Sequence, residues 1–302
     1  MATELVRELV DSGIHFGHRV SRWNPKMKPY IFDKRNLIHI IDLRETVKGL
    51  LRAKKFLSRV ASGGGQVLFV GTKRQARHSI EHHAKRSGQP FVAERWLGGT
   101  LTNFRTIRSR LGRLEELELE ESSGKLQEYS KKAVASRLRE RRKIFRNLDG
   151  IRTMSKLPEA LVIVDVQREH IAVREAKKLG IPTVCLIDTD SDPAFADIPI
   201  PGNDDAIRSI DIVLKHLADA VEEGKRSRPP EVEQKDAGGG PRKRSRRALA
   251  RADEGPMGAE DAGGRGDDAG AATAVAEPQA GQTPAAGTSE SPAEDRPPTE
   301  SA

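Results

Sequence analysis

The chain has 302 residues, a mass of 33.2 kDa, a formal net charge of +8 and a single cysteine. This length allows one large domain with accessory segments, and one cysteine excludes an intrachain disulfide, as is typical of a reducing cytoplasm. No apolar run approaches the ~20 residues of a membrane span, and the partly acidic start is unlike a secretory signal peptide. We therefore expect a cytoplasmic protein without membrane contact.

The charge is unevenly distributed along the chain. Residues 1–224 hold 40 basic and 30 acidic side chains, residues 225–251 hold 10 and 3, and residues 252–302 hold 2 and 11. The basic excess of the first segment favours a polyanionic partner. A solvated basic surface would give the same composition.

Strands and helices alternate in the first hundred residues. Residues 4–12 have helical spacing, with Thr3 as the cap and Gly13 as the stop, and residues 37–41 read as a strand. Next, Asp42 and Glu45 predict a capping box for a long helix that ends at residues 63–65.

The same alternation continues with a strand at residues 66–70. Thr72 and Gln75 predict a second capping box, for a helix that ends at Gly88. The segment that follows, residues 91–104, contains the Gly98–Gly99 pair, and we expect it to be irregular.

A strand–helix–strand unit spans residues 160–192. Its strands, at residues 161–164 and 183–188, are apolar and end in Asp, and residues 168–179 carry a helical apolar stripe. This pattern predicts a right-handed crossover in a parallel sheet, whose ligands usually lie beyond the strand ends. Cys185, inside the second strand, is expected to be a core residue.

Two further helical regions complete the ordered part. Residues 106–147 carry a thin apolar seam between densely charged positions, with a turn at 121–125, which predicts a protruding antiparallel helical hairpin. After an extended segment at 198–202, Asn203 or Asp204 would cap a last helix that ends at Gly224.

These elements divide the chain into three parts. Residues 1–104 and 149–224 form an α/β globular domain, residues 105–148 form the inserted hairpin, and residues 225–302 form a disordered tail, basic and then acidic. The tail lacks the apolar residues that would offset its chain entropy. Its arginine-rich part, 241–251, could hold RNA or simply keep the chain soluble.

Motifs for catalysis are absent or incomplete. Residues 65–73 lack the Gly-Lys-Ser/Thr order of a phosphate loop, and no Gly-x-Gly-x-x-Gly opens a helix. Asp188, Asp190 and Asp192 resemble the start of a calcium loop, but Pro replaces both its Gly and its Glu. His78, His82 and His83 lack further metal ligands nearby in sequence and suit a solvated helix face. We expect no cofactor, and a magnesium contact through Asp188 and Asp190 stays open.

Two basic segments that we expect to be largely irregular, residues 14–30 and 91–105, are the candidates for binding. Cations beside flat rings suit phosphates and unstacked bases; Trp23 could equally fill the edge of the core. Lys73 and Arg74 open a helix that can receive a phosphate, and Gly98 and Gly99 allow close backbone approach. The candidate RNA-binding residues are His15, His18, Arg19, Arg22, Trp23, Asn24, Lys26, Lys28, Lys73, Arg74, Arg95, Trp96, Gly98, Gly99, Thr102, Asn103 and Arg105.

Eight short motifs, in order over residues 5–224, resemble the family of the second protein of the bacterial small ribosomal subunit. They are GIHFGH (13–18), WNPKM (23–27), YIF (30–32), VGTKRQA (70–76), RWLGGTLTNF (95–104), MSKLP (154–158), DTDSDP (188–193) and IPGNDDAI (200–207). The family pattern usually has Asn at the position of Asp190.

The resemblance implies a flavodoxin-like (Rossmann-like) three-layer sandwich with a parallel sheet and a protruding helical hairpin. It also implies a structural, non-catalytic protein that binds small-subunit ribosomal RNA and neighbouring ribosomal proteins, including the mRNA-binding "S-one" protein, and that is not a homo-oligomer. Two alternatives are an RNA-binding adaptor outside the ribosome and an α/β enzyme acting on a phosphorylated small molecule.

Overall fold

The computed structural model describes residues 2–228. From residue 229 onwards the predicted disordered tail, with its arginine-rich part, lies outside the described residues. The predicted start of the tail at residue 225 falls within the last described helix, which continues to Arg226. None of the helices within residues 2–228 combines the length and the apolar character that a membrane span needs.

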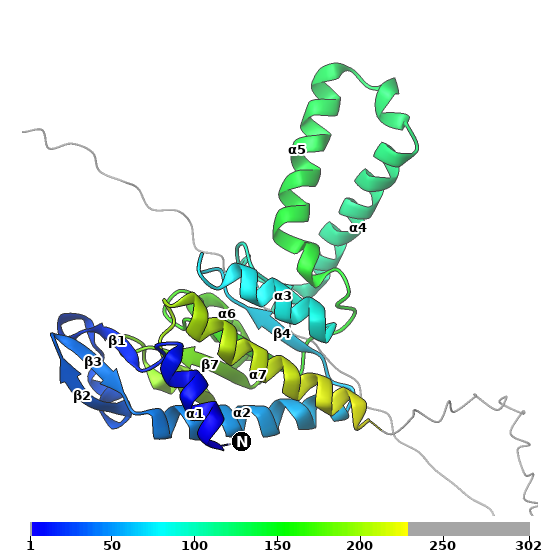
Figure 1. Ribbon diagram of the computed structural model, residues 1–302. Coiled ribbons are helices and arrows are strands. Elements are labelled where there is room, and N and C mark those ends of the chain that lie inside the picture. Colours follow the sequence, from blue (N-terminus) through cyan, green and yellow to red (C-terminus); the bar gives the residue numbers. More distant parts are fainter. Residues whose placement is uncertain (1, 229–302) are drawn as a thin grey trace, which may run out of the picture. The chain divides into compact units, whose positions relative to one another are not determined.

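The helices and strands follow one another as Figure 1 shows. The first half contains α1 (Ala2–Asp11), β1 (Phe16–Arg19), η1 (Val20–Arg22), η2 (Pro25–Tyr30), β2 (Ile31–Arg35), β3 (Ile38–Ile41), α2 (Leu43–Ser62), β4 (Val67–Val70), α3 (Arg77–Ser87) and β5 (Phe91–Val92). The second half contains α4 (Phe104–Ser122), η3 (Lys125–Glu128), α5 (Lys131–Leu148), η4 (Asp149–Ile151), β6 (Ala160–Val164), α6 (His170–Leu179), β7 (Thr183–Ile187), η5 (Pro193–Phe195), β8 (Ile198–Pro201) and α7 (Ile207–Arg226).

Five parallel strands form the main sheet, in the spatial order β5-β4-β6-β7-β8. Numbered by their order along the chain, these strands stand 2-1-3-4-5, which is the flavodoxin-like order. In register, Val162 of β6 lies beside Phe69 of β4 and Val184 of β7. The predicted α/β class with a parallel sheet is confirmed.

Alternate strand residues enter two separate cores, because successive side chains of a strand point to opposite faces. Phe69 and Leu186 pack with α2, α3 and α7 on one face, and Leu68 and Cys185 pack with α6 and residues 96–101 on the other. Helices therefore cover both faces, as the predicted three layers require. Cys185 is fully buried, and burial raises the pKa of its thiol to about 12, so its prediction as a core residue is confirmed.

A second, antiparallel sheet in the order β1-β3-β2 was not predicted. It shows that the expectation of largely irregular structure over residues 14–30 was partly wrong, since β1 and two 3-10 helices lie there. Asn36 and Leu37 both take positive φ, 49° and 62°, in the two-residue turn between β2 and β3. Leu37 is thus a turn residue, and the predicted strand begins one residue later, at Ile38.

Only one of the predicted helix caps formed. Asp42 caps α2 by accepting the backbone N–H of Arg44 at 2.8 Å, but Glu45 pairs with Lys48 instead of closing the box. The Thr72–Gln75 capping box is wrong, because α3 begins only at Arg77.

The caps predicted for the two terminal helices are also wrong. Helix α1 begins at Ala2, so it already includes Thr3. Helix α7 begins at Ile207, after a turn in which Asn203 accepts the backbone N–H groups of Asp205 and Ala206.

Helices α4 and α5 form the predicted antiparallel hairpin, which extends away from the sheet (Figure 1). Its base is anchored in the second core by Ile107, Leu111 and Leu148. Farther out the two helices are joined by ion pairs, such as Arg137 to Glu120 at 2.7 Å. Leu148 is the only buried residue among those of α5, which leaves most of that helix to solvent.

Candidate nucleic-acid interface

The first predicted binding segment, residues 14–30, is fixed by one deeply buried side chain. Met27 of η2 is fully buried in the second core, which also holds Trp96 and Leu101 of the other predicted segment. Both segments are therefore attached to the same face of the sheet. Around Met27 the predicted cations are exposed; they are Arg19, Arg22, Lys26 and Lys28.

The aromatic and polar side chains of this segment mainly support it. Trp23 is half-buried, with its ring 5.2 Å from the ring of His39. Asn24 caps η2 by accepting the backbone N–H of Lys26, and its own backbone N–H donates to the carbonyl of Thr189. The side chain of Asn24 also lines a pocket beside α6.

The two histidines of the segment differ in their charge. His15 lies against Phe16, with 4.1 Å between ring centroids, and burial lowers its pKa. His18 bonds through Nδ1 to Asp188 at 3.0 Å, and this hydrogen bond raises the pKa of the imidazole to about 9. At neutral pH His18 is therefore a cation, but one that an internal carboxylate already neutralises.

Lys73 is likewise neutralised inside the chain. Its Nζ lies 2.6 Å from Asp204, 2.7 Å from Asp205 and 3.4 Å from Asp165. Burial opposes its charge, but these carboxylates outweigh burial and raise the pKa of the ammonium. Burial and the neighbouring Asp165 raise the pKa of Asp204. Lys73 thus has no free charge to offer a phosphate, whereas the next residue, Arg74, is exposed.

The acidic side chains next to this cluster were candidates for a magnesium contact. Ligand atoms of His18, Asp188 and Asp204 all lie within 4.8 Å of one another. However, His18 holds Asp188 and Lys73 holds Asp204, so protein cations occupy the positions in which a metal would be expected. Asp190 adds a half-buried carboxyl whose pKa is raised by burial, which makes it a weaker ligand. Two protein cations, His18 and Lys73, therefore neutralise part of the charge of this acidic cluster.

The second predicted segment is organised by Glu175, a residue that sequence reasoning missed. Its Oε1 accepts the indole N–H of Trp96 at 3.1 Å and the backbone N–H of Gly99 at 2.7 Å. Its Oε2 accepts the backbone N–H groups of Leu101 and Thr102, both at 3.0 Å, and the Thr102 hydroxyl at 3.1 Å. Burial alone would raise the pKa of Glu175, but these hydrogen bonds outweigh it and lower the pKa.

This carboxylate changes what the loop can do. The donors of Trp96, Gly99 and Thr102 point inward, and Trp96 is only 7% exposed, so its ring has no free face for a base. Gly99 takes φ +88°, the left-handed conformation that turns its N–H towards the carboxylate. The side of the loop that faces solvent carries Arg95, Gly98, Asn103 and Arg105.

The sequence did contain one signal for Glu175. It lies between Ala172 and Ala176 on the apolar stripe predicted for α6, where a carboxylate is unexpected unless hydrogen-bond donors meet it.

The two segments together present exposed cations that have no ion-pair partner among the described residues. Within residues 2–228 no carboxylate forms an ion pair with Arg19, Arg22, Lys28, Arg74, Arg95 or Arg105.

Comparison with known proteins gives one consistent match. The family model "Ribosomal protein S2" matches residues 9–224. The chain is 64% identical over 225 residues to "Small ribosomal subunit protein uS2" of Rhodopirellula baltica, covering 74% of this chain and 86% of the relative. It is 52% identical over 228 residues to the protein of that name from Mycolicibacterium paratuberculosis, covering 76% and 83%. It is also 52% identical over 225 residues to that of Acidothermus cellulolyticus, covering 74% and 82%.

Proposed function

The chain belongs to the ribosomal protein S2 family, and from this membership we propose that it is a structural protein of the small ribosomal subunit, acting in translation in the cytoplasm. The observation that carries the proposal is the match of one ribosomal family over residues 9–224, which is nearly all of the described chain. A protein of the subunit contacts its ribosomal RNA and its other proteins.

The contacts to RNA are assigned to the exposed cations of the two basic segments. Arg19, Arg22 and Lys28 lie on the first segment, and Arg95 and Arg105 lie on the second. Lys26 is also exposed, although it pairs with Asp192 at 2.6 Å. Such contacts to phosphates position a protein on RNA without reading its sequence.

Four of the candidate residues, in addition to His18, bond to other parts of the protein instead. Lys73 is enclosed by three carboxylates, and Trp96, Gly99 and Thr102 donate to Glu175. We assign them to holding the RNA-binding segments in place. Their contribution to RNA binding is then indirect.

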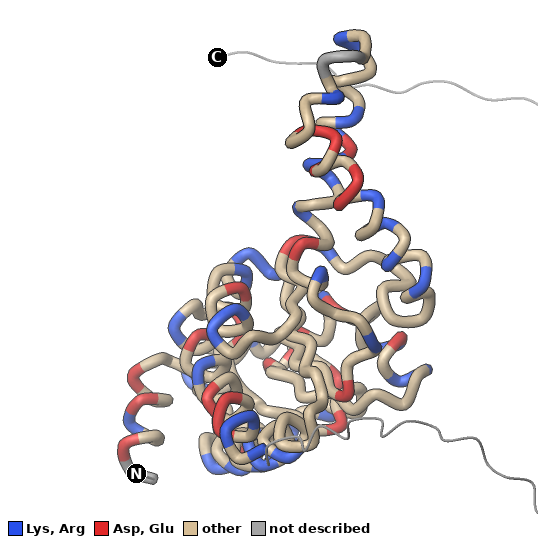
Figure 2. Tube along the Cα trace, turned by 90° about the vertical axis from the view of Figure 1, so that its right-hand side faces the viewer, with Lys and Arg blue, Asp and Glu red and all other residues tan. Residues whose placement is uncertain are grey.

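The hairpin offers a further basic surface. Figure 2 shows basic residues along both of its helices. Among the described residues Arg139, Arg142 and Arg146 of α5 are exposed and make no ion pair. We propose that this surface contacts RNA or a neighbouring ribosomal protein. We propose that the "S-one" protein is one such neighbouring protein. We also propose that each subunit contains a single copy of the chain.

The enzyme alternative is less well supported. A phosphorylated substrate at the carboxyl edge of the sheet would need free cations near the ends of β4 and β6. Lys73, which lies there, is already paired with Asp165, Asp204 and Asp205, which leaves the exposed Arg74 beside it. We therefore propose a non-catalytic role without a cofactor.

Sedimentation of ribosomal subunits tests the proposal. The tagged full chain should occur in the small-subunit fraction at one copy per subunit, and at the same level after a high-salt wash. Persistent absence from that fraction would favour the adaptor alternative. Saturable binding of a small phosphorylated compound in a thermal-shift screen would instead favour the enzyme.

A variant of the exposed cations tests the assigned contacts. Combined replacement of Arg19, Arg22 and Lys28 by Ala should reduce incorporation into subunits. Replacement of three cations on α2, Arg52, Lys55 and Arg59, is the matched control, because they lie away from both segments. Equal incorporation of the two variants would refute the assignment.

A further inference from the structure

A groove runs along α6 on the side of η5, and we call it the α6 groove. It consists of two adjoining hollows of about 340 and 200 Å³, and Val173 and Phe195 line both of them. Phe195 is 45% exposed, although Val173 beside it is buried. A large ring is therefore presented to solvent at the middle of a concave surface.

One wall of the groove carries two cations, Arg174 and Lys177, beside His170. His170, Arg174 and Lys177 of α6 all line it. Their spacing of four and three residues places them on one face of the helix. Within the described chain Arg174 and Lys177 form no ion pair, since no carboxylate lies within 4.0 Å of either.

The opposite wall is acidic, but its carboxyl groups already have partners within the chain. Asp192 pairs with Lys26 at 2.6 Å, and Asp197 accepts the backbone N–H of Thr183 at 2.8 Å. Asp190 accepts the hydroxyl of Ser191 at 3.2 Å, and burial raises its pKa. Within the described chain the charged groups of the groove that have no partner are therefore Arg174 and Lys177, and an anion is the ligand that would meet both.

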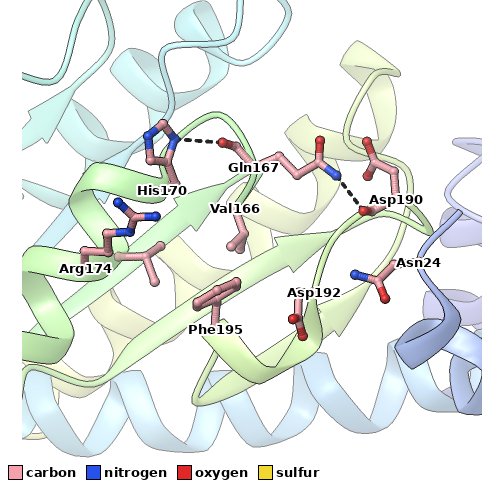
Figure 3. Close-up of a pocket in the computed structure, with 9 residues that line it drawn as sticks. Asn24, Val166, Gln167, His170, Arg174, Asp190, Asp192 and Phe195 are labelled. Atoms are coloured by element: carbon pink, nitrogen blue, oxygen red, sulfur yellow. Dashed lines mark hydrogen bonds between the residues drawn. The ribbon is translucent and has the colours of Figure 1, made fainter. Parts of the chain in front are cut away.

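Figure 3 shows how these walls face each other across the larger hollow. His170 and Arg174 lie on one side, Asp192 and Asn24 lie on the other, and Phe195 lies between them. The span from residue 170 to residue 177 is about 10 Å along the helix. That length accommodates two or three nucleotides of a single strand.

We propose that the α6 groove binds unpaired nucleotides of RNA, with one base stacked on Phe195 and the adjacent phosphates on Arg174 and Lys177. A base within a duplex has no free face, so an exposed ring in a basic groove selects single-stranded RNA. The inference rests on the proposed function, because a protein of the small subunit meets RNA. It adds a site on the sheet's α6 side that adjoins the first basic segment, since Asn24 lines the groove and Lys26 pairs with Asp192 of its acidic wall.

Binding of a short oligonucleotide to the full-length protein tests the stacking. The probe is fluorescein-labelled hexa-adenylate, measured by fluorescence anisotropy at low salt. Phe195→Ala should weaken binding at least about five-fold, and Phe195→Trp should retain it. Phe32→Ala is the matched control, since Phe32 is 74% exposed and lies on β2, away from the groove.

The charges are tested with the same probe. Arg174→Ala combined with Lys177→Ala should reduce the magnitude of the salt slope of log K by about 1.4, at ~0.7 for each phosphate that is no longer neutralised. Lys54→Ala with Lys55→Ala on α2 should leave the slope unchanged. The inference is overturned if Phe195→Ala and the double variant bind the probe as the wild type does, with all variants showing the wild-type melting curve.

Cross-linking in assembled subunits separates this inference from the proposed function. With p-benzoylphenylalanine in place of Phe195, irradiated small subunits should show cross-links to RNA. Cross-links to protein alone, or none to RNA, overturn the inference in favour of a peptide ligand or of no ligand. Failure of the chain to sediment with small subunits would instead refute the proposed function, while hexa-adenylate binding would still report on the groove.

Discussion

Replacing Glu175 by Gln should destabilise the protein far more than a surface substitution does. The carboxylate accepts five hydrogen bonds, from Trp96, Gly99, Leu101 and twice from Thr102. Glutamine keeps one acceptor oxygen but places an NH₂ group against the donors that faced the other oxygen. At least two donors then lack an acceptor in a buried site.

The size of the effect follows from those unsatisfied donors. Each buried donor left without a partner costs about 1–3 kcal/mol, so two of them should lower the free energy of unfolding by about 2–6 kcal/mol. For a domain of this size that corresponds to a drop in Tm of about 4–24 °C. Calorimetry or thermal unfolding of the purified full chain measures it. Glu116→Gln is the control, since Glu116 makes an exposed ion pair with Arg113 and should change stability by less than about 1 kcal/mol.

The effect should also depend on pH in a defined direction. The folded-state pKa of Glu175 is lowered from its ordinary value near 4.5, so its stabilisation is present above that value and is lost as pH falls through the lower, folded-state pKa. The stability difference between wild type and Glu175→Gln should therefore narrow in acid. A drop in Tm of less than about 2 °C at neutral pH, or a difference that widens in acid, would refute the reasoning.

Three further predictions concern other parts of the molecule. In urea titrations the wild type should be more stable than His18→Asn by about 1–2 kcal/mol, a value that allows for the partly exposed ring. Because the folded-state pKa of His18 is raised to about 9, this difference in the free energy of unfolding should be complete below pH 6.5 and should vanish as the pH rises through about 9. Gly49→Ala should lower Tm, because the new Cβ would lie 2.5 Å from a backbone carbonyl oxygen of β8. Gly112→Ala on α4 should raise Tm, because no atom lies within 4 Å of the new Cβ and alanine favours the helix. Arg22→Ala should reduce the magnitude of the salt slope of RNA binding by about 0.7–0.9 and Lys55→Ala should not; equal slopes would remove Arg22 from the interface.

The α/β framework could be predicted because its signals are local. The apolar runs of β4, β6 and β7, the helical stripes between them and stops such as Gly88 and Gly180 each lie within a few residues of chain. The hairpin followed from the same kind of periodicity. In contrast, the antiparallel sheet was missed because its turn, Asn36-Leu37, lacks the Asn-Gly signal of a tight hairpin.

The incorrect helix caps have a different cause. Thr72 and Asp204 have the residue types of caps, but each is used by a partner distant in sequence. The hydroxyl of Thr72 donates to Glu169 at 2.5 Å, and Asp204 holds Lys73. A capping rule that considers only neighbouring residues cannot anticipate hydrogen-bond partners that lie 97 or 131 residues away along the chain.

The same limit applies to the candidate site. Composition and breakers placed the two basic segments, and the structure leaves most of their cations exposed. Three candidate side chains bond instead to carboxylates of distant segments. Lys73 pairs with Asp204, His18 pairs with Asp188, and Trp96 donates to Glu175. Which donors are free to meet RNA is therefore a property of the folded chain and not of the motif.

The carboxyl edge of the sheet shows why this fold can serve as a scaffold here. Between β4 and β6, where a flavodoxin-like sheet usually holds its ligand, Asp165 takes φ +68°, a conformation that costs a non-glycine residue about 1–2 kcal/mol. Two interactions of the Asp165 side chain offset this conformational cost. The carboxylate accepts the backbone N–H of Arg168 and lies 3.4 Å from Nζ of Lys73. The strained position therefore directs Asp165 into an ion pair with Lys73 at this edge. In the described chain, exposed cations without an ion-pair partner lie on the two basic segments, the hairpin and the α6 groove, where a large polyanion can reach them without entering the fold.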